Sequence, residues 1–136
     1  MNTIHNVNII DIPKVHDERG ILAVIEKESI PFAIKRVYYL YDVPTESSRG
    51  GHAHKEQQSV IIALSGSFEV IVDDGITKKR IMLNKPNRGL YIPTHIWREI
   101  ENFSSGAVCL VLASTSYNEL EYIRDYNEFS IQKGEL

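Results

Sequence analysis

Turn-forming residues divide most of this chain into segments that are too short for anything except β-strands. These turns are Ser65-Gly66, Asp73-Asp74-Gly75, Lys85-Pro86-Asn87 and Ser104-Ser105-Gly106. Short runs rich in β-branched residues lie between them, and Asp74-Gly75 between two alternating runs is typical of a hairpin. About nine short strands with tight turns indicate an all-β sandwich or barrel. We expect strands at residues 6–10, 21–26, 33–41, 59–64, 67–72, 77–83, 89–92, 98–102 and 107–114.

One segment near the C-terminus has a helical pattern instead. Residues 117–129 carry acidic residues early and apolar Leu120, Ile123 and Tyr126 at helical spacing. We therefore expect a short C-terminal helix on an otherwise all-β chain.

Length and composition narrow the class of protein. The 136 residues are enough for one domain, residues 1–136, and 43% hydrophobic with 24% charged residues fits a soluble globular chain. A formal charge of −3 argues against a nucleic-acid partner, and no apolar run is long enough to cross a membrane. The N-terminus has no secretion signal and Cys109 is the single cysteine, so we expect a cytoplasmic protein without disulfides.

His52 and His54 mark the best candidate for a functional site. They precede an apolar run, and residues two apart in a strand point to the same face. With unbroken alternation, Gln58 and Val60 would share that face. Two titratable rings aimed into an apolar interior need partners or a function. The alternative is a histidine pair on a solvated strand edge, but an interior site is favoured.

A β-roll that carries His-x-His on a central strand resembles the cupins. Cupins commonly bind a metal with this pair, a glutamate a few residues on, and a histidine from a second motif. In this sequence Gln58 and Ser59 occupy the glutamate positions, and Arg98 occupies the position of the second-motif histidine. Arginine stays protonated and cannot donate a lone pair, and two imidazoles are too few for a dedicated transition-metal centre. We therefore expect a cupin-type jelly-roll barrel with no metal and no cofactor.

The resemblance becomes more specific when the whole chain is considered. The segments that carry it are residues 17–20 (Asp-Glu-Arg-Gly), 30–39, 49–55 (Arg-Gly-Gly-His-Ala-His-Lys), 73–75, 89–91, Trp97 and 122–126 (Tyr-Ile-Arg-Asp-Tyr). In these segments the sequence resembles the sugar-nucleotide 3,4-ketoisomerases, which convert dTDP-4-keto-6-deoxy-D-glucose into its 3-keto isomer. This family implies a metal-free homodimeric cupin that serves the synthesis of 3-amino-3,6-dideoxy sugars.

The residue types suit this reaction. A ketone moves from C4 to C3 when a base removes the C3 proton, donors stabilise an enediolate, and C4 is protonated. A neutral imidazole suits the first step and a second imidazole can relay a proton. The family positions make His52 the preferred base and His54 the preferred shuttle, although spacing alone does not rank them. Arg98, with Arg49 or a tyrosine, is available to stabilise the oxyanion.

Planar arginine forks are the expected ligands of a diphosphate. Arg19, Arg36, Arg49 and Arg88 are candidates, although a lone arginine is more often a solvated surface charge. Arg19 and Arg49 are favoured because they lie within segments that match the family.

Three further side chains are weaker candidates for substrate contact. In the strand with three tyrosines, alternation sends Tyr39 and Tyr41 to the face opposite Tyr38, and the family position favours Tyr38 as a catalytic residue. Trp97 is either a base-stacking platform or, more commonly, a core anchor. Gln58 completes the predicted substrate-binding set.

Other functions remain open. The chain could be a 3,5-epimerase of a sugar nucleotide, a metal-dependent cupin that uses His52 and His54, or a non-catalytic sugar-binding cupin. If it is a ketoisomerase, Arg98 favours the gluco product, because some relatives carry histidine there. An apolar first strand (Val7, Ile9, Ile10) would leave an unpaired edge, which a homodimer could cover by exchanging N-terminal strands.

Overall fold

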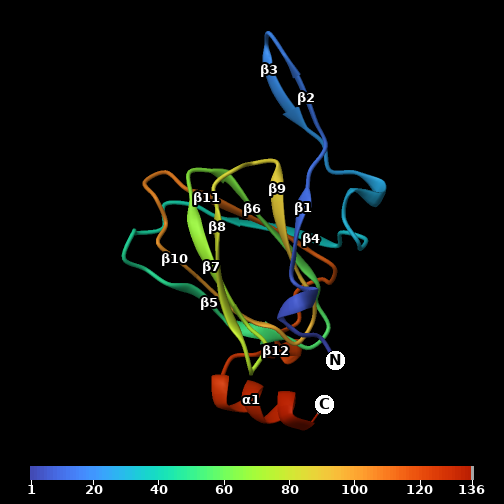
Figure 1. Ribbon diagram of the computed structural model, residues 1–136, viewed down its shortest axis with the longest axis vertical. Helices are drawn as coiled ribbons and strands as arrows, with labels where there is room; N and C mark the ends of the chain where they lie inside the picture. Colours follow the sequence, from blue (N-terminus) through green and yellow to red (C-terminus); the bar gives the residue numbers. More distant parts are fainter. Residues whose placement is uncertain (136) are drawn as a thin grey trace.

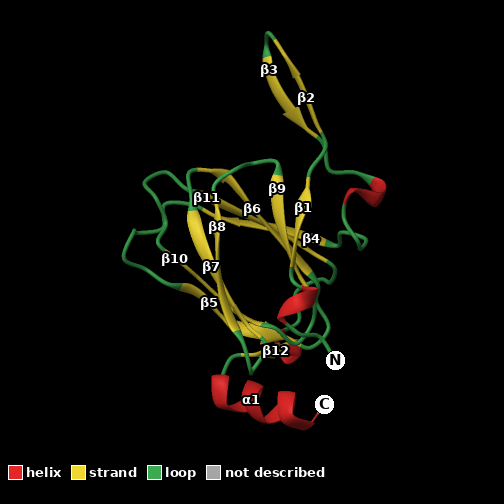
Figure 2. Cartoon of the chain, viewed as in Figure 1, coloured by secondary structure: helices red, strands yellow, loops and turns green. Residues whose placement is uncertain are grey.

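Two five-stranded antiparallel sheets face each other in the computed structural model, which describes residues 1–135 (Figures 1 and 2). The first sheet has the order β1 (Asn8–Asp11), β9 (Arg88–Ile92), β6 (Ser59–Ser65), β11 (Val108–Ala113) and β4 (Arg36–Leu40). The second has the order β12 (Tyr122–Ile123), β5 (Arg49–His54), β10 (Trp97–Glu101), β7 (Phe68–Asp73) and β8 (Lys78–Leu83). The all-β roll with a short C-terminal helix that the sequence predicts is confirmed.

The core lies between these sheets because alternate residues of each strand point inward. In β6, Ile61 and Ala63 join the buried cluster that also holds Phe68 and Val70 of β7. Val60 and Ile62 point the other way and pack in a second cluster on the outer face of the first sheet. The predicted hairpin between β7 and β8 is confirmed, with Gly75 at a φ of 92°.

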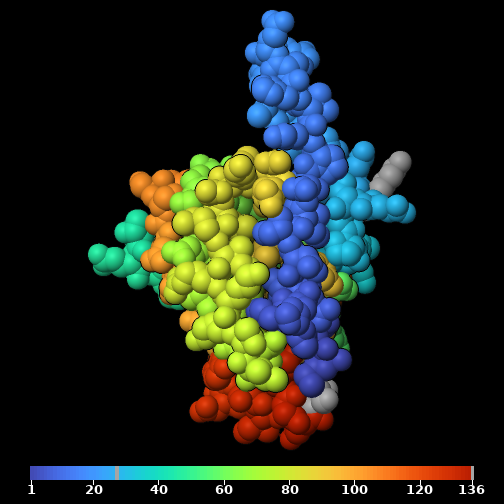
Figure 3. Space-filling model, in the orientation of Figure 1, coloured from blue at the N-terminus to red at the C-terminus, as the bar shows by residue number. Residues whose placement is uncertain are grey.

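A two-stranded hairpin extends away from the roll (Figures 1 and 3). β2 (Lys14–Asp17) pairs with β3 (Gly20–Ala23), so the strand expected at 21–26 starts one residue earlier and ends at Ala23. Val15, Ile21 and Leu22 are 60%, 59% and 63% exposed. Three large apolar side chains thus lie in solvent on this hairpin, whose two strands pair with each other and with no other described strand.

The helix expected at 117–129 is wrong in position. A 3-10 turn (Glu119–Glu121) is followed by β12, and the α-helix α1 runs from Tyr126 to Glu135. The reason is tertiary pairing: Tyr122 and Ile123 form a ladder with His54 and Ala53 of β5, which overrides the helical spacing of the apolar residues. Two more 3-10 turns occupy Ile4–Asn6 and Lys27–Ser29. Within residues 1–135, no helix is long and apolar enough to cross a membrane.

Candidate active site

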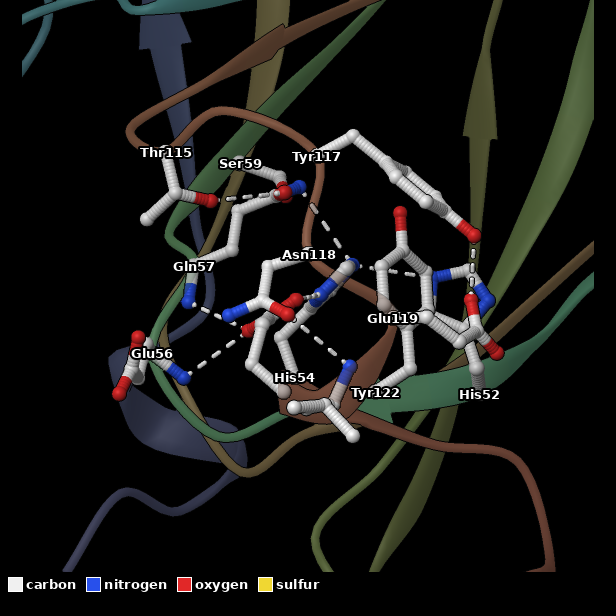
Figure 4. Close-up of polar contacts among 12 residues, drawn as sticks. His52, His54, Glu56, Gln57, Ser59, Thr115, Tyr117, Asn118, Glu119 and Tyr122 are labelled. Carbon is white, nitrogen blue, oxygen red and sulfur yellow. Dashed lines mark hydrogen bonds and ion pairs between the residues drawn. The ribbon is translucent and has the colours of Figure 1, made fainter.

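The two histidines lie side by side at the end of β5. Their Nε2 atoms are 3.0 Å apart and the rings meet edge to face, with centroids 4.6 Å apart. Tyr122 of β12 covers both rings, at centroid distances of 5.0 Å from His52 and 4.4 Å from His54 (Figure 4). His54 is fully buried, whereas His52 lines a cavity. The predicted interior pair is therefore present, and its two members have different access to the cavity.

That cavity has a volume of about 390 Å³ and is lined by strands of both sheets. Leu40, Ile61, Ile100 and Val111 form part of its apolar wall. Within the described part of the chain its lining includes four arginines and no carboxylate, so it suits an anionic ligand. Its polar lining comprises Arg36, Tyr38, Arg49, His52, Arg98, Tyr117, Tyr122 and Arg124.

Arg98 is a buried cation that faces this cavity. Alternation along β10 turns Arg98 and Ile100 inward, and the Arg98 side chain is only 3% exposed. Its guanidinium donates to the carbonyl of Ile96 and to Ser59 Oγ at 3.3 Å, and no carboxylate of the described residues forms an ion pair with it. Burial lowers the pKa of Arg98 to about 10. An unpaired buried charge of this kind is suited to an anion that arrives with the ligand.

The electrostatics keep both imidazoles neutral. Burial, followed by the positive charge of Arg98, lowers the pKa of His52 to about 3. Burial and Arg98 also lower the pKa of His54. A neutral imidazole has a free lone pair, so His52 is in the form that can accept a proton from a ligand in the cavity.

Two of the other predicted residues, Arg36 and Tyr38, reach the same space from β4. The Arg36 guanidinium lies 4.9 Å from the Tyr38 ring centroid and donates to Tyr122 Oη at 3.1 Å. Burial raises the pKa of Tyr38, so its hydroxyl keeps its proton. As predicted, Tyr39 and Tyr41 lie on the opposite, exposed side. Arg49, at the start of β5, completes the predicted residues that line the cavity.

Gln58 lies outside the cavity, so the expectation that it shares a face with the histidines is wrong. A turn at residues 55–58 interrupts the strand after His54, and the alternation restarts in the opposite sense. Gln58 Oε1 accepts from Tyr91 Oη at 2.7 Å on the outer face. Gln57 takes the inner place, with its Nε2 atom 3.4 Å from His54 Nε2 and 3.0 Å from Ser59 Oγ (Figure 4).

Trp97 also lies outside the cavity. It points outward from β10 and packs against Tyr126 and Phe129 of α1, with centroid distances of 5.3 and 5.8 Å. Its Nε1 atom donates to Glu99 at 3.0 Å. Of the two interpretations, the structure supports the core anchor, because neighbouring residues of a strand face opposite sides.

Arg19 and Arg88, which the sequence predicts as phosphate ligands, do not line the cavity of their own chain. Arg19 sits at the tip of the β2–β3 hairpin, 90% exposed and paired with Asp17 at 2.8 Å. Arg88 pairs with Asp11 at 3.2 Å at the edge of the first sheet.

Sequence reasoning missed several residues of the site. Arg124 lies at the cavity with its guanidinium 4.4 Å from the Tyr122 ring centroid, and it pairs with Glu119. Glu121 is a buried carboxylate in contact with His54 Nδ1. Both residues lie in the segment that the sequence predicts to be helical. The local sequence pattern does not reveal that β12 pairs with β5 and so brings these residues close to the histidines. Among the described residues, no group of three or more histidine, cysteine, aspartate or glutamate side chains is arranged to hold a metal ion.

Comparison with known proteins identifies close relatives along nearly the whole chain. Residues 5–134 match the family described as FdtA: WxcM-like, C-terminal. The TDP-4-oxo-6-deoxy-α-D-glucose-3,4-oxoisomerase of Aneurinibacillus thermoaerophilus is 47% identical over 122 residues, which cover 89% of this chain and 88% of that protein.

Solved structures agree with this match. The structure of a 3,4-ketoisomerase from Helicobacter canadensis is 48% identical, with a TM-score of 0.92 over 95% of this chain and 98% of that one. QdtA, a sugar 3,4-ketoisomerase from Thermoanaerobacterium thermosaccharolyticum in complex with TDP, is 40% identical, with a TM-score of 0.95 over 98% of both chains. A histidine-to-asparagine variant of QdtA was solved with TDP-4-keto-6-deoxyglucose, and its TM-score is also 0.95, at 40% identity over 98% of this chain and 97% of that one.

Proposed function

Because this chain belongs to the FdtA family and is a 3,4-ketoisomerase of TDP-sugars, we propose that it converts TDP-4-keto-6-deoxyglucose to the 3-keto isomer, with His52 as the base. The observation that carries this assignment is the neutral His52–His54 pair at the wall of a cavity that also holds Arg98, a buried charge with no ion-pair partner among the described residues. The substrate is the compound bound by the related QdtA variant.

His52 is the better candidate for the base because it lines the cavity and His54 lies behind it. The neutral ring of His52 takes the proton from C3, and the electron pair of the C–H bond forms the enediolate with its negative charge on O4. A proton moves from the hydroxyl at C3 to O4, and protonation of C4 then leaves the ketone at C3. His54, 3.0 Å from His52, is the partner that relays protons.

Arg98 supplies the charge that the enediolate needs. It is held between both sheets before the substrate arrives, so no reorganisation is required when the oxyanion forms. The protonated hydroxyl of Tyr38 is a second donor that faces the same cavity. Arg98 stands at a position where some relatives carry histidine, and on this basis we assign the 6-deoxy-gluco configuration to the product.

Arg49, Arg124 and Arg36 are the side chains available for the diphosphate and the sugar. All three line the cavity, and the guanidinium fork fits phosphate oxygens. The Arg36 guanidinium also donates a hydrogen bond to Gln57 Oε1 at 2.8 Å, and this bond fixes its orientation at the cavity.

The exposed hairpin supports a homodimer in which Arg19 serves the site of a second copy. Val15, Ile21 and Leu22 would be buried by such contact, and Arg19 would be carried with them. This arrangement explains how a residue from a matching motif can lie far from the cavity of its own chain. A role in the supply of 3-amino-3,6-dideoxy sugars follows from the 3-keto product, because that ketone is the group an amine would replace.

Incubating the purified protein with TDP-4-keto-6-deoxyglucose and following the sugar carbons by NMR tests the proposal. A ketoisomerase moves the carbonyl signal from C4 to C3. A 3,5-epimerase would leave the ketone at C4 and change the coupling at C3 and C5, and a binding protein would produce no new species. Either of the last two outcomes would contradict the proposed function.

A further inference from the structure

Behind the histidine pair lies a carboxylate that does not touch the cavity. Glu121 is 4% exposed, and its Oε1 atom accepts the backbone N–H groups of Glu56 and Gln57, each at 3.0 Å. Its Oε2 atom contacts His54 Nδ1. A carboxylate that already accepts two N–H donors offers only lone pairs to a third neighbour. His54 therefore donates Nδ1–H to Glu121.

The opposite side of the His54 ring is ordered by a second, independent contact. Gln57 Oε1 accepts from Arg36 at 2.8 Å. It also accepts from Thr115 at 3.2 Å (Figure 4). Arginine has only donors, so the amide oxygen must face it, and the amide nitrogen must face His54 Nε2 at 3.4 Å. Both ends of the ring thus require the same neutral tautomer, with hydrogen on Nδ1 and a lone pair on Nε2.

We propose that Glu121 is a positioning residue that fixes His54 in this tautomer, so that Nε2 of His54 accepts the Nε2 proton of His52 once the other ring nitrogen of His52 has taken the C3 proton of the substrate. This inference rests on the proposed function for the identity of the proton donor. After the C3–H bond breaks, the His52 imidazolium gives its Nε2 proton to His54 Nε2, which lies 3.0 Å away. The Glu121 carboxylate balances the charge of the resulting His54 imidazolium, and the reverse transfer returns the proton to the substrate.

Glu121→Gln is a sharp test because the two backbone N–H groups that contact residue 121 determine how the new side-chain amide is oriented. Its oxygen has to accept the two backbone N–H groups, which turns its NH2 group toward His54 Nδ1. The shorter contact at Nδ1 then drives the ring to place its lone pair on Nδ1 and its hydrogen on Nε2, where it faces His52, at the cost of the longer, 3.4 Å contact with Gln57. An aspartate-to-asparagine change with the same consequence in a serine protease lowers kcat about 10⁴-fold. We expect a loss of roughly 10² to 10⁴-fold in kcat here, with TDP affinity unchanged.

The tautomer can be read directly by long-range ¹H–¹⁵N correlation NMR of the imidazoles. The His54 signals are assigned by their loss in His54→Asn. In the wild-type protein Nδ1 should carry hydrogen, and in Glu121→Gln it should carry the lone pair. The matched control is Glu128→Gln, an exposed glutamate on α1 that accepts from Gln132 at 3.1 Å; it should match the wild type in both spectrum and rate.

Each outcome decides one of the two proposals. A wild-type spectrum with the lone pair on His54 Nδ1 would overturn the role of Glu121, and this measurement does not require the Glu121→Gln variant to fold. A folded Glu121→Gln protein that keeps both the tautomer and the rate would overturn it as well. If the wild-type protein fails to isomerise TDP-4-keto-6-deoxyglucose while the tautomers behave as expected, the proposed function fails instead.

Discussion

Replacing Arg98 by methionine should make the protein more stable and nearly inactive. Arg98 is buried without a carboxylate partner among the described residues, and burial lowers its pKa from 12.5 to about 10. At 1.36 kcal/mol per pKa unit, this displacement corresponds to about 3 kcal/mol of unrecovered desolvation. Methionine keeps the apolar stem and removes the charge, so the folded state no longer bears this cost.

Part of the gain is lost with the hydrogen bonds to Ile96 and Ser59, which are long at 3.3 Å and therefore worth only about 0.5 kcal/mol for each partner, the weak end of the usual range. We therefore expect the free energy of unfolding to rise by about 1–2 kcal/mol and Tm to rise by roughly 3–10 °C for a chain of this length. Since Arg98 is the preorganised donor to the enediolate, kcat should fall about 10² to 10³-fold.

Thermal unfolding at a fixed protein concentration, together with turnover of TDP-4-keto-6-deoxyglucose followed by NMR, measures both effects. The control is Arg80→Met, which removes an exposed arginine of β8 that pairs with Glu101, and should change Tm and turnover little. If Arg98→Met melts below the wild type, or keeps near wild-type turnover, then Arg98 is a stabilising core residue and not a destabilising catalytic charge.

Three further predictions concern pH, assembly and metal. Burial lowers the pKa of His52 from 6.5 to about 3, so its neutral form stabilises the fold above pH 6.5 and this contribution is lost as the pH falls toward 3. The free energy of unfolding measured with urea should therefore decrease as the pH is lowered from 6.5, with a slope of up to about 1.4 kcal/mol per pH unit from His52, and His52→Asn should flatten this profile. Light scattering at micromolar concentration should give twice the chain mass of 15.5 kDa, and a monomer would refute the dimer. Treatment with EDTA should leave turnover unchanged, whereas loss of activity and recovery with zinc, iron or manganese would show that a metal is required.

Much of this fold can be predicted from the sequence because turns and strand alternation are determined by residues that are close together in the chain. The turn at Asp74-Gly75, the alternation that separates Tyr38 from Tyr39, and the common side of His52 and His54 depend only on strand periodicity. The inward direction of Arg98 follows the same rule once β10 is located.

The rest depends on tertiary contacts that no local pattern contains. The turn after His54 reverses the alternation, so Gln57 and not Gln58 reaches the histidines. β12 forms because its residues pair with β5, and only that pairing brings Glu121 and Arg124 to the site. Arg19 has the sequence context of a ligand-binding residue, yet it lies on an arm whose position in an assembly a single sequence cannot specify.

The most direct test of His52 as the base uses TDP-4-keto-6-deoxyglucose that carries deuterium at C3. The wild-type enzyme should remove this label as it forms the 3-keto product, and NMR follows the loss. Removing a general base costs about 10² to 10⁴-fold, so His52→Asn should remove the label more slowly by that factor while its affinity for TDP changes little. If His52→Asn removes the label at near the wild-type rate, the base is a different residue and the role assigned to the histidine pair is wrong.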